Sequence, residues 1–533
     1  MRVDYEKLKP WVIPSSAIVS VSVLLLVITR VVDMLLYHYN ANVFAVLYTQ
    51  DAGNLTNTIG GLGELVSAIM GIEITVLAII VQLAANKYSS KIMELFIQNK
   101  INIIVIMLYV ITAIYTVTVS NTITGENVPY FSITFSLLMI LSCLMIVIPH
   151  FNYVSNFLRP NYFITYVQDK IDKDLQDIIK KSEAAGGNPP SSLVSEKKDS
   201  IAENINFIGD IALNSVIQGD RATVLLCVAT LKSLTVDYLP LKQSLPNSWF
   251  KFSGLAYYDP DFSSYSRFVL SVIERKKIFL ERKVFRLFEM LYSNSRVTLR
   301  DVASGVLLNS ELIGSGAMKA SDNGALHCTF QYFNSYLRIA IRERDPRSAF
   351  NTLEHYRVLA EELMDVNPKM VETIFFYFKY YGQEANKFQV LFILETAAHD
   401  LCVLMELAYE KQVPNQAALL KLFLTVDEPI EESKEKGSSK EASLIGVRVA
   451  QAKLAGFYLL NGEEDLARVI FEDMKLEPYG RIMKIQELIE NTKEEEFWEI
   501  TPRGVNFNYV SDERRHALKA FFGWFEEKEV KES

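Results

Sequence analysis

The sequence predicts an all-α protein in which a four-span transmembrane helical domain precedes a large cytoplasmic helical domain. The first observation is a step in charge density. Residues 1–150 contain seven Lys/Arg and eight Asp/Glu, and the rest of the 533-residue chain holds 47 of the 54 basic and 55 of the 63 acidic side chains. The second observation is that the charge-poor segment contains four apolar runs, each near the roughly 20 residues that cross a bilayer.

These four runs define a membrane domain at residues 1–152. Basic residues precede the first run, occupy the connection between the second and third, and follow the fourth, whereas the other two connections contain no Lys or Arg. Because basic loops remain in the cytoplasm, both termini are predicted to be cytoplasmic. The four predicted spans are about 11–38, 59–85, 101–120 and 130–149.

One face of the second run carries small or polar side chains at spacings of three or four residues, which place them in a single stripe along a helix. Two interpretations are open. Small residues let helices approach closely, with hydroxyls and amides bonding across the interface. Alternatively, copies of the helix line an aqueous path in an oligomer, with Glu64 at its outer mouth. We call this stripe the polar seam; its members are Glu64, Ser67, Gly71, Thr75, Ala78, Gln82 and Asn86.

Glu73 lies in the middle of the same run but off the polar seam, about 200° around the helix from Gly71. A carboxylate inside a bilayer is costly, and the third and fourth runs offer hydroxyls but no Lys or Arg to neutralise it. Glu73 is therefore interpreted either as a neutral donor between helices or as a proton or cation site.

A further polar group is expected near the outer end of the first run. Arg30 and Asp33 are three residues apart on one helical face, and Glu64 is predicted at about the same depth. They could form an outer ionic cluster, or Arg30 could extend to the lipid headgroups.

Several segments resemble one bacterial membrane-protein family, domain of unknown function 2254. They are "LKPWVIP" before the first span, Asp33, "GIEITVLAIIVQLAANKYSSKIMELF" in and after the second span, and "PHFNYVSNFLRP" after the fourth. "ALNSVIQGDRATVLLCVATLKSL" from Ala212 is similar to a further family segment, although Ser90 stands where the family usually has proline. The resemblance implies a multi-pass protein of the bacterial inner membrane and no established activity.

The remaining sequence is predicted to be helical, an irregular α-solenoid available for protein contacts. Residues 153–426 form the cytoplasmic helical domain, 427–443 a polar flexible loop, and 444–533 a C-terminal helical region. Within the last, 446–478 has the spacing of a tetratricopeptide-like hairpin. Its pattern residues are Leu454, Ala455, Tyr458, Gly462, Ala467, Phe471 and Met474.

A basic run lies in the middle of the helical domain. It could meet anionic lipid or a protein partner, or it could be a solvated helix face balanced by Glu274, Glu281 and Glu289. The run consists of Arg275, Lys276, Lys277, Arg282, Lys283 and Arg286.

The sequence carries no signature of an enzyme, a cofactor or a metal centre. It has no phosphate-binding glycine loop, dinucleotide fingerprint or His-Glu-x-x-His, and its six histidines are scattered. The formal charge of −9 argues against nucleic-acid binding, and the four separated cysteines imply no disulfide framework.

Two functions remain. The first is a homo-oligomeric ion channel or transporter in the lipid bilayer, with the second span lining the path and the cytoplasmic helices acting as a gating or sensing domain. The second is a membrane-anchored interaction or signalling scaffold that binds a protein partner through its helical repeats.

Overall fold

The computed structural model describes residues 5–39, 43–48, 51–124, 128–187, 189–252, 258–427 and 439–532. The chain divides into two compact units, Met1–Tyr166 and Val167–Ser533, which we call the membrane unit and the solenoid unit. Apart from an isolated bridge between Glu496 and Val505, the regular structure in the described residues is helical. The all-α prediction is confirmed.

The membrane unit contains four long helices that correspond to the four predicted spans. Each of the four is long and apolar enough to cross a bilayer. The last continues through Pro149 to Phe157, beyond the predicted end of the fourth span. The elements are α1 (Tyr5–His38), η1 (Val43–Leu47), α2 (Ala52–Lys87), α3 (Lys91–Ile97), α4 (Lys100–Ser120) and α5 (Tyr130–Phe157).

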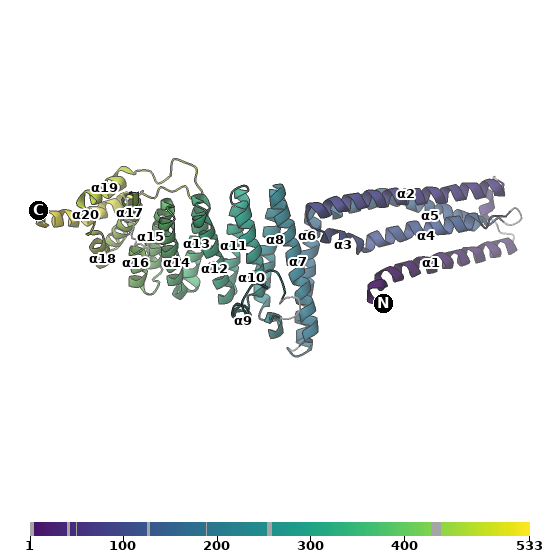
Figure 1. The fold of residues 1–533 in the computed structure, drawn as a ribbon, viewed down its shortest axis with the longest axis horizontal. Coiled ribbons are helices and arrows are strands. Elements are labelled where there is room, and N and C mark those ends of the chain that lie inside the picture. The colour runs from purple at the N-terminus through teal and green to yellow at the C-terminus, as the bar shows by residue number, and fades with distance from the viewer. Residues whose placement is uncertain are drawn as a thin grey trace. The chain divides into compact units, whose positions relative to one another are not determined.

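Helix α4 packs against α1, α2 and α5, and α2, α4 and α5 run alongside one another (Figure 1). The α2–α4 contact is close because two glycines of α2 face small residues of α4. A Cβ added at Gly63 would lie 3.2 Å from Cγ2 of Thr116, and one at Gly60 would lie 3.2 Å from Oγ of Ser120. Small residues that bring backbones together are the usual basis of helix packing in membranes.

The solenoid unit is built from helices that stack in chain order (Figure 1). One layer consists of α8, α11, α13, α15 and α17, and a second of α7, α10, α12, α14 and α16. Helix α6 (Pro160–Ala184) crosses the boundary between the units. The other elements are α7 (Ser191–Gln218), α8 (Arg221–Leu241), η2 (Asn247–Phe250), α9 (Arg267–Lys276), α10 (Phe279–Ser295), α11 (Arg300–Lys319), α12 (Asn323–Arg342), α13 (Pro346–Val366), η4 (Pro368–Met370), α14 (Val371–Lys387), α15 (Leu391–Glu410), α16 (Gln416–Leu424), α17 (Ser439–Leu460), α18 (Glu464–Met474), α19 (Tyr479–Asn491) and α20 (Asp512–Glu532).

Helix α8 is a fifth helix with the length and hydropathy of a membrane span, which the sequence analysis did not predict. It packs against α7 and α11 inside the solenoid unit. Its apolar side chains, such as Val224, Leu231 and Tyr238, are buried there. The hydropathy of α8 is thus accounted for by burial in a helical core.

Several of the turns between solenoid helices share one construction. A residue with positive φ follows the helix, and the next N–H bonds back to the carbonyl five residues earlier, which satisfies the helix end. Where that next residue is Asp, its carboxylate then caps the following helix, as Asp322 does for α12 and Asp345 for α13. The positive-φ residues of such turns include Gly219, Lys277, Ser321, Arg344, Gln389, Gln412 and Gly462.

The predicted tetratricopeptide-like hairpin corresponds to α17 and α18. Gly462, with φ +81°, forms the turn between them. The apolar pattern residues Leu454, Ala455, Tyr458, Ala467 and Met474 are buried. Most of the predicted loop 427–443, namely residues 428–438, is not among the described residues. Helix α17 begins at Ser439.

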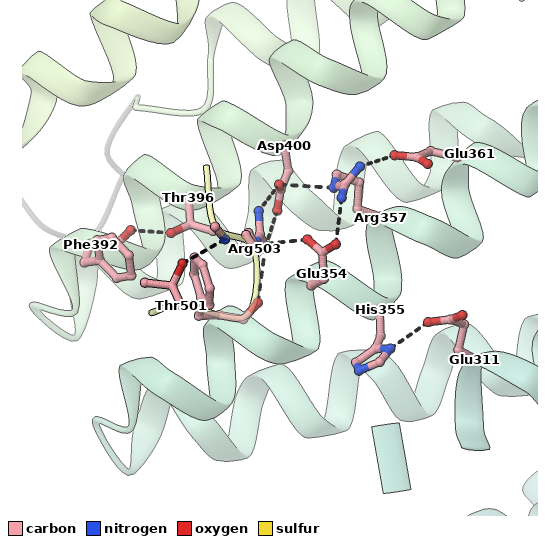
Figure 2. Close-up of polar contacts among 12 residues, drawn as sticks. Glu311, Glu354, His355, Arg357, Glu361, Phe392, Thr396, Asp400, Thr501 and Arg503 are labelled. Atoms are coloured by element: carbon pink, nitrogen blue, oxygen red, sulfur yellow. Dashed lines mark hydrogen bonds and ion pairs between the residues drawn. The ribbon is translucent and has the colours of Figure 1, made fainter. Parts of the chain in front are cut away.

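A buried ion network fixes the segment after α19 to the solenoid core. Figure 2 shows Asp400 of α15 between Arg503 of that segment and Arg357 of α13. Nη2 of Arg503 lies 3.0 Å from Oδ2 of Asp400, and Nε of Arg503 lies 3.0 Å from Glu354. Burial raises the pKa of Asp400, and the two guanidinium groups oppose that shift.

Candidate functional site

Glu73 points into the interior of the membrane unit. It occupies the inward face of α2 together with Val66, Leu77 and Val81, and all four side chains are buried. Its Oε1 lies 2.7 Å from Nδ1 of His150 on α5. The carboxylate therefore has a titratable nitrogen partner.

His150 is held between two polar groups. Its Nδ1 contacts Glu73, and its Nε2 lies 3.2 Å from Oδ1 of Asn102 near the start of α4. The amide nitrogen of Asn102 donates at 2.8 Å to the carbonyl of Phe96 on α3. These contacts form a continuous line that is buried from Glu73 through His150 to Asn102 and ends at the half-buried Phe96 of α3.

The geometry assigns the hydrogens of this line. A backbone carbonyl only accepts, so the amide nitrogen of Asn102 faces Phe96 and its oxygen faces His150. Nε2 of His150 must then carry a hydrogen, and one proton remains for the contact between Nδ1 and Glu73. Whichever group holds that proton, the pair has no net charge, which makes its burial in a membrane far less costly.

The second carboxylate oxygen of Glu73 is buried and has no hydrogen-bond partner among the residues that the structure describes. Tyr109 of α4 and Cys143 of α5 lie close enough to the carboxylate to interact with its charge. The hydroxyl of Tyr109 donates to the carbonyl of Cys143 at 3.2 Å, and the Cys143 thiol contacts Thr112 Oγ1 at 3.3 Å. These hydroxyls continue the polar interior of the unit beyond Glu73.

The polar seam faces away from the interior. All seven of its residues are exposed on the outer surface of α2. The hydroxyls of Ser67 and Thr75 bond to carbonyls of α2 itself, at 3.0 and 2.7 Å, and Gly71 has no atom within 4 Å of an added Cβ. Among the described residues of one chain the seam is exposed and forms no close helix contact. Gly60 and Gly63 provide the close packing instead.

Arg30 and Asp33 bind the ends of other helices. The carboxylate of Asp33 accepts from the backbone N–H groups of Phe131 and Ser132 at 2.9 and 3.2 Å, and so caps the N-terminus of α5. Arg30 donates at 3.4 Å to the carbonyl of Thr122, just after α4. Both contacts place a charge against the opposite end of a helix dipole. The described residues include no ion pair of Glu64 with Arg30, so the three groups are not brought together as a cluster.

The sequence analysis missed His150 because it ended the fourth span at Pro149. Proline removes one ladder hydrogen bond but does not always end a helix. A signal was present, since the buried residues Ser132, Ser136, Cys143, His150 and Phe157 share one helical face. Extending that periodicity past Pro149 would have placed His150 inward.

Residues 8–229 match the family described as "Predicted membrane protein (DUF2254)". The match confirms the expected family resemblance over that range and supports a membrane location. No curated protein matches the chain. Among solved structures, the chain is similar to a "Circular tandem repeat protein with novel repeat topology and enhanced subunit contact surfaces", at 13% identity and a TM-score of 0.31, over 90% of this chain and 99% of that one.

Proposed function

We propose that this membrane protein moves protons across the bacterial inner membrane through the interior of its membrane unit, as a transporter or channel without catalytic activity. The observation that carries the proposal is the buried line of Glu73, His150 and Asn102. Chains of carboxylate and imidazole inside membranes are typical of proton relays. An imidazole has two nitrogens, so it can accept a proton on one side and donate a proton on the other.

The pair can change its charge by one unit without moving far. With one proton between Nδ1 and Glu73 the pair is neutral, and loss of that proton leaves a single negative charge. The 2.7 Å separation is short enough for direct transfer between the two groups. A relay also needs a second contact, through which the proton leaves Glu73 on the side away from His150. The second carboxylate oxygen of Glu73, which has no hydrogen-bond partner among the described residues, is free to make that contact.

The line has a direction along the membrane unit. Asn102 and Phe96 lie in the region that joins α2 to α4, where Lys87, Lys91 and Lys100 are found. The positive-inside rule places that end in the cytoplasm, together with both termini and the solenoid unit. Protons would therefore enter or leave Glu73 on the cytoplasmic side through His150. The amide of Asn102 orients the imidazole and does not carry a proton itself, so water would exchange the proton with His150 on that side.

The polar seam fits an oligomer of this transporter. Glu64, Gln82 and Asn86 are exposed on α2, and long polar side chains facing lipid are unfavourable. We therefore assign the seam to contacts between copies of α2 in a homo-oligomer, where amides can pair across the interface. The proton path then lies inside each copy, at Glu73. The polar seam lies on the opposite, outward face of the same helix.

Proton flux into liposomes containing the purified full-length protein tests the proposal. A pH-sensitive dye trapped inside reports the flux under an imposed pH gradient. We expect Glu73→Gln and His150→Gln to lower the flux at least tenfold while the protein still assembles. The matched control is Glu64→Gln, which removes a carboxylate from the same helix on the exposed face and should leave the flux unchanged.

Loss of flux in Glu64→Gln with normal flux in Glu73→Gln would instead place the path along the polar seam, as in a pore between copies. If liposomes with the wild-type protein show no proton flux at any pH gradient or voltage, the transport proposal is wrong. The second candidate would then stand, a membrane-anchored scaffold. It is favoured by the stacked hairpins of the solenoid unit, an architecture that presents long surfaces to protein partners.

A further inference from the structure

An arginine-rich cavity lies on the surface of the solenoid unit, across α10, α12 and α14. Its volume is about 530 Å³, and a smaller cavity of about 150 Å³ adjoins it and shares the lining residues Arg338 and Tyr381. We call the two together the arginine pocket. Small-molecule sites usually have volumes of about 300–1,000 Å³, so the pocket has the size of such a site.

Four arginines converge on this pocket from two helices. Helix α10 contributes Arg282 and Arg286, and α12 contributes Arg338 and Arg342. Each pair is spaced by four residues, so its members lie on the same helical face. Two carboxylates also line the pocket, from Glu289 and Glu384. The local excess of positive charge is unusual in a chain with a net charge of −9.

The structure divides the basic run of the sequence into members with different surroundings. Lys283 is fully buried and bonds to Asp259 and Asp261, both at 2.7 Å, so it belongs to the core. Arg286 is exposed at the pocket, where its Nη1 lies 3.0 Å from Glu289. A solvated, charge-balanced helix face therefore describes Arg286 and not Lys283.

Several polar groups of the pocket have hydrogen-bonding capacity left. Arg338 and Arg342 form no ion pair with any residue that the structure describes. Nε of Arg282 and Oδ1 of Asn334 are buried without a partner in the described part of the chain. Buried polar atoms are normally satisfied, and a bound ligand is one way to satisfy them.

Aromatic rings orient the guanidinium groups. Cζ of Arg282 lies 5.5 Å from the ring centroid of Tyr265 and 5.2 Å from that of Tyr332. Tyr377 and Tyr381 line the pocket from α14 and bring further hydroxyls. A guanidinium held in place by stacking presents its planar pair of donors in a fixed direction, which suits bidentate contact with phosphate oxygens.

We propose that the arginine pocket binds a small soluble ligand that carries two or more phosphate groups. Two arginine pairs on neighbouring helices match two adjacent phosphates, whose charges exceed those of single carboxylates. The pocket is confined to three helices and the preceding loop at Tyr265, so it suits a compact ligand better than an extended acidic peptide. This inference is independent of proton movement in the membrane unit.

Titration calorimetry of the full-length protein in detergent, with inorganic pyrophosphate as the probe, tests the proposal. We expect one site per chain and at least tenfold weaker binding in Arg338→Ala and in Arg286→Ala. Both side chains are exposed, so the variants should melt like the wild type in the absence of pyrophosphate. The matched control is Arg221→Ala, which removes an exposed arginine of α8 away from the pocket lining.

Three results would overturn the proposal. The wild type could fail to bind pyrophosphate at millimolar concentration. Arg221→Ala could weaken binding as much as Arg338→Ala, which would indicate a general charge effect. Finally, poly-glutamate or vesicles with phosphorylated lipid could bind in an Arg338-dependent manner while pyrophosphate does not, which would assign the pocket to a peptide or a membrane surface.

Discussion

The two units bury charged side chains with different partners. In the solenoid unit, buried carboxylates meet Lys or Arg: Asp400 contacts Arg503, and Glu281 lies 2.6 Å from Nζ of Lys242. In the membrane unit, Asp33 contacts backbone N–H groups and Glu73 contacts a histidine. Lys and Arg partners keep their charge near neutral pH, whereas histidine can lose it. The first arrangement fixes the fold, and the second places two proton-binding groups in direct contact.

The largest effect is expected where a fixed ion network is broken. Asp400→Ala leaves Arg503 and Arg357 without their buried counter-charge, and breaking a buried pair costs about 3–5 kcal/mol. The free energy of unfolding of the solenoid unit should fall by that amount. It can be followed by labelling of the buried Cys402 on the same helix as temperature or denaturant rises. The exposed pair of Glu464 and Arg468 provides the control, since Glu464→Ala should change little.

The second-largest effect is expected at Lys198 of the solenoid unit. This lysine is buried against a backbone carbonyl and aromatic rings, whereas the buried carboxylates of the unit form ion pairs. It donates at 2.7 Å to the carbonyl of Lys251 and lies 4.0 Å from the ring centroid of Phe279. Burial lowers the pKa of Lys198 from 10.5 to about 7. Between those two pH values the unfolded chain binds a proton that the folded chain does not, so stability rises with pH in that window.

Lys198→Met should remove this pH dependence and raise the stability near pH 7, by at most a few kcal/mol. Melting curves followed by tryptophan fluorescence at pH 7, 8 and 9 provide the measurement, because Trp249 adjoins the lysine. If the slope of the melting temperature against pH is the same in the variant and the wild type, the lysine is charged in the folded state.

An intermediate effect is expected at the close contact of α2 and α4. Gly63→Leu forces a side chain against Thr116, where a Cβ alone would lie 3.2 Å away, and overpacking of this kind costs about 1–3 kcal/mol. Labelling of the buried Cys143 during heating measures it. Gly71→Leu is the matched control on the exposed face of α2. It should leave the melting of one chain unchanged and, if the seam joins copies, alter only the oligomer in detergent.

The smallest effect concerns the helix cap that distinguishes Asp33 from the paired carboxylates of the solenoid unit. Asp33→Asn keeps one acceptor oxygen for the N-terminus of α5 and loses the other, at a cost of about 1 kcal/mol. The same Cys143 labelling detects it. Asp51→Asn is the comparison, because Asp51 caps α2 from an exposed position and its carboxylate, among the described residues, accepts from the backbone N–H of Asn54 alone. A larger loss in Asp51→Asn would contradict the role given to Asp33.

The fold could be predicted because its main signals are local. Apolar runs and the step in charge density marked the four long helices, and the spacing from Leu454 to Met474 marked the α17–α18 hairpin. Which face of α2 points inward could not be predicted in the same way. Both the inward face and the polar seam of α2 have side chains that could pack against another helix. The face that points inward is the one whose glycines fit against small residues of α4, such as Thr116 and Ser120.

The candidate site was predicted only in part, because its members come from helices that are far apart in the sequence. Glu73 was identified from its cost in a membrane, but its partner lies 77 positions away on another helix. Arg503 and Asp400 are even further apart, at 103 positions. Contacts between distant segments depend on how helices pack, which one sequence does not encode in a local pattern. His150 was also missed because the fourth span was predicted to end at Pro149, whereas α5 continues to Phe157.

Pro149 has a mechanical consequence for the residue that follows it. Proline has no N–H, so the carbonyl of Met145 lacks its usual donor within α5, and a helix bends most easily at such a missing bond. His150 therefore directly follows the position of the missing bond in α5. A small rotation of the last turns of the helix changes the separation of the imidazole from Glu73, which is 2.7 Å when the two are in contact. The contact of the two side chains is thus sensitive to the backbone geometry at Pro149.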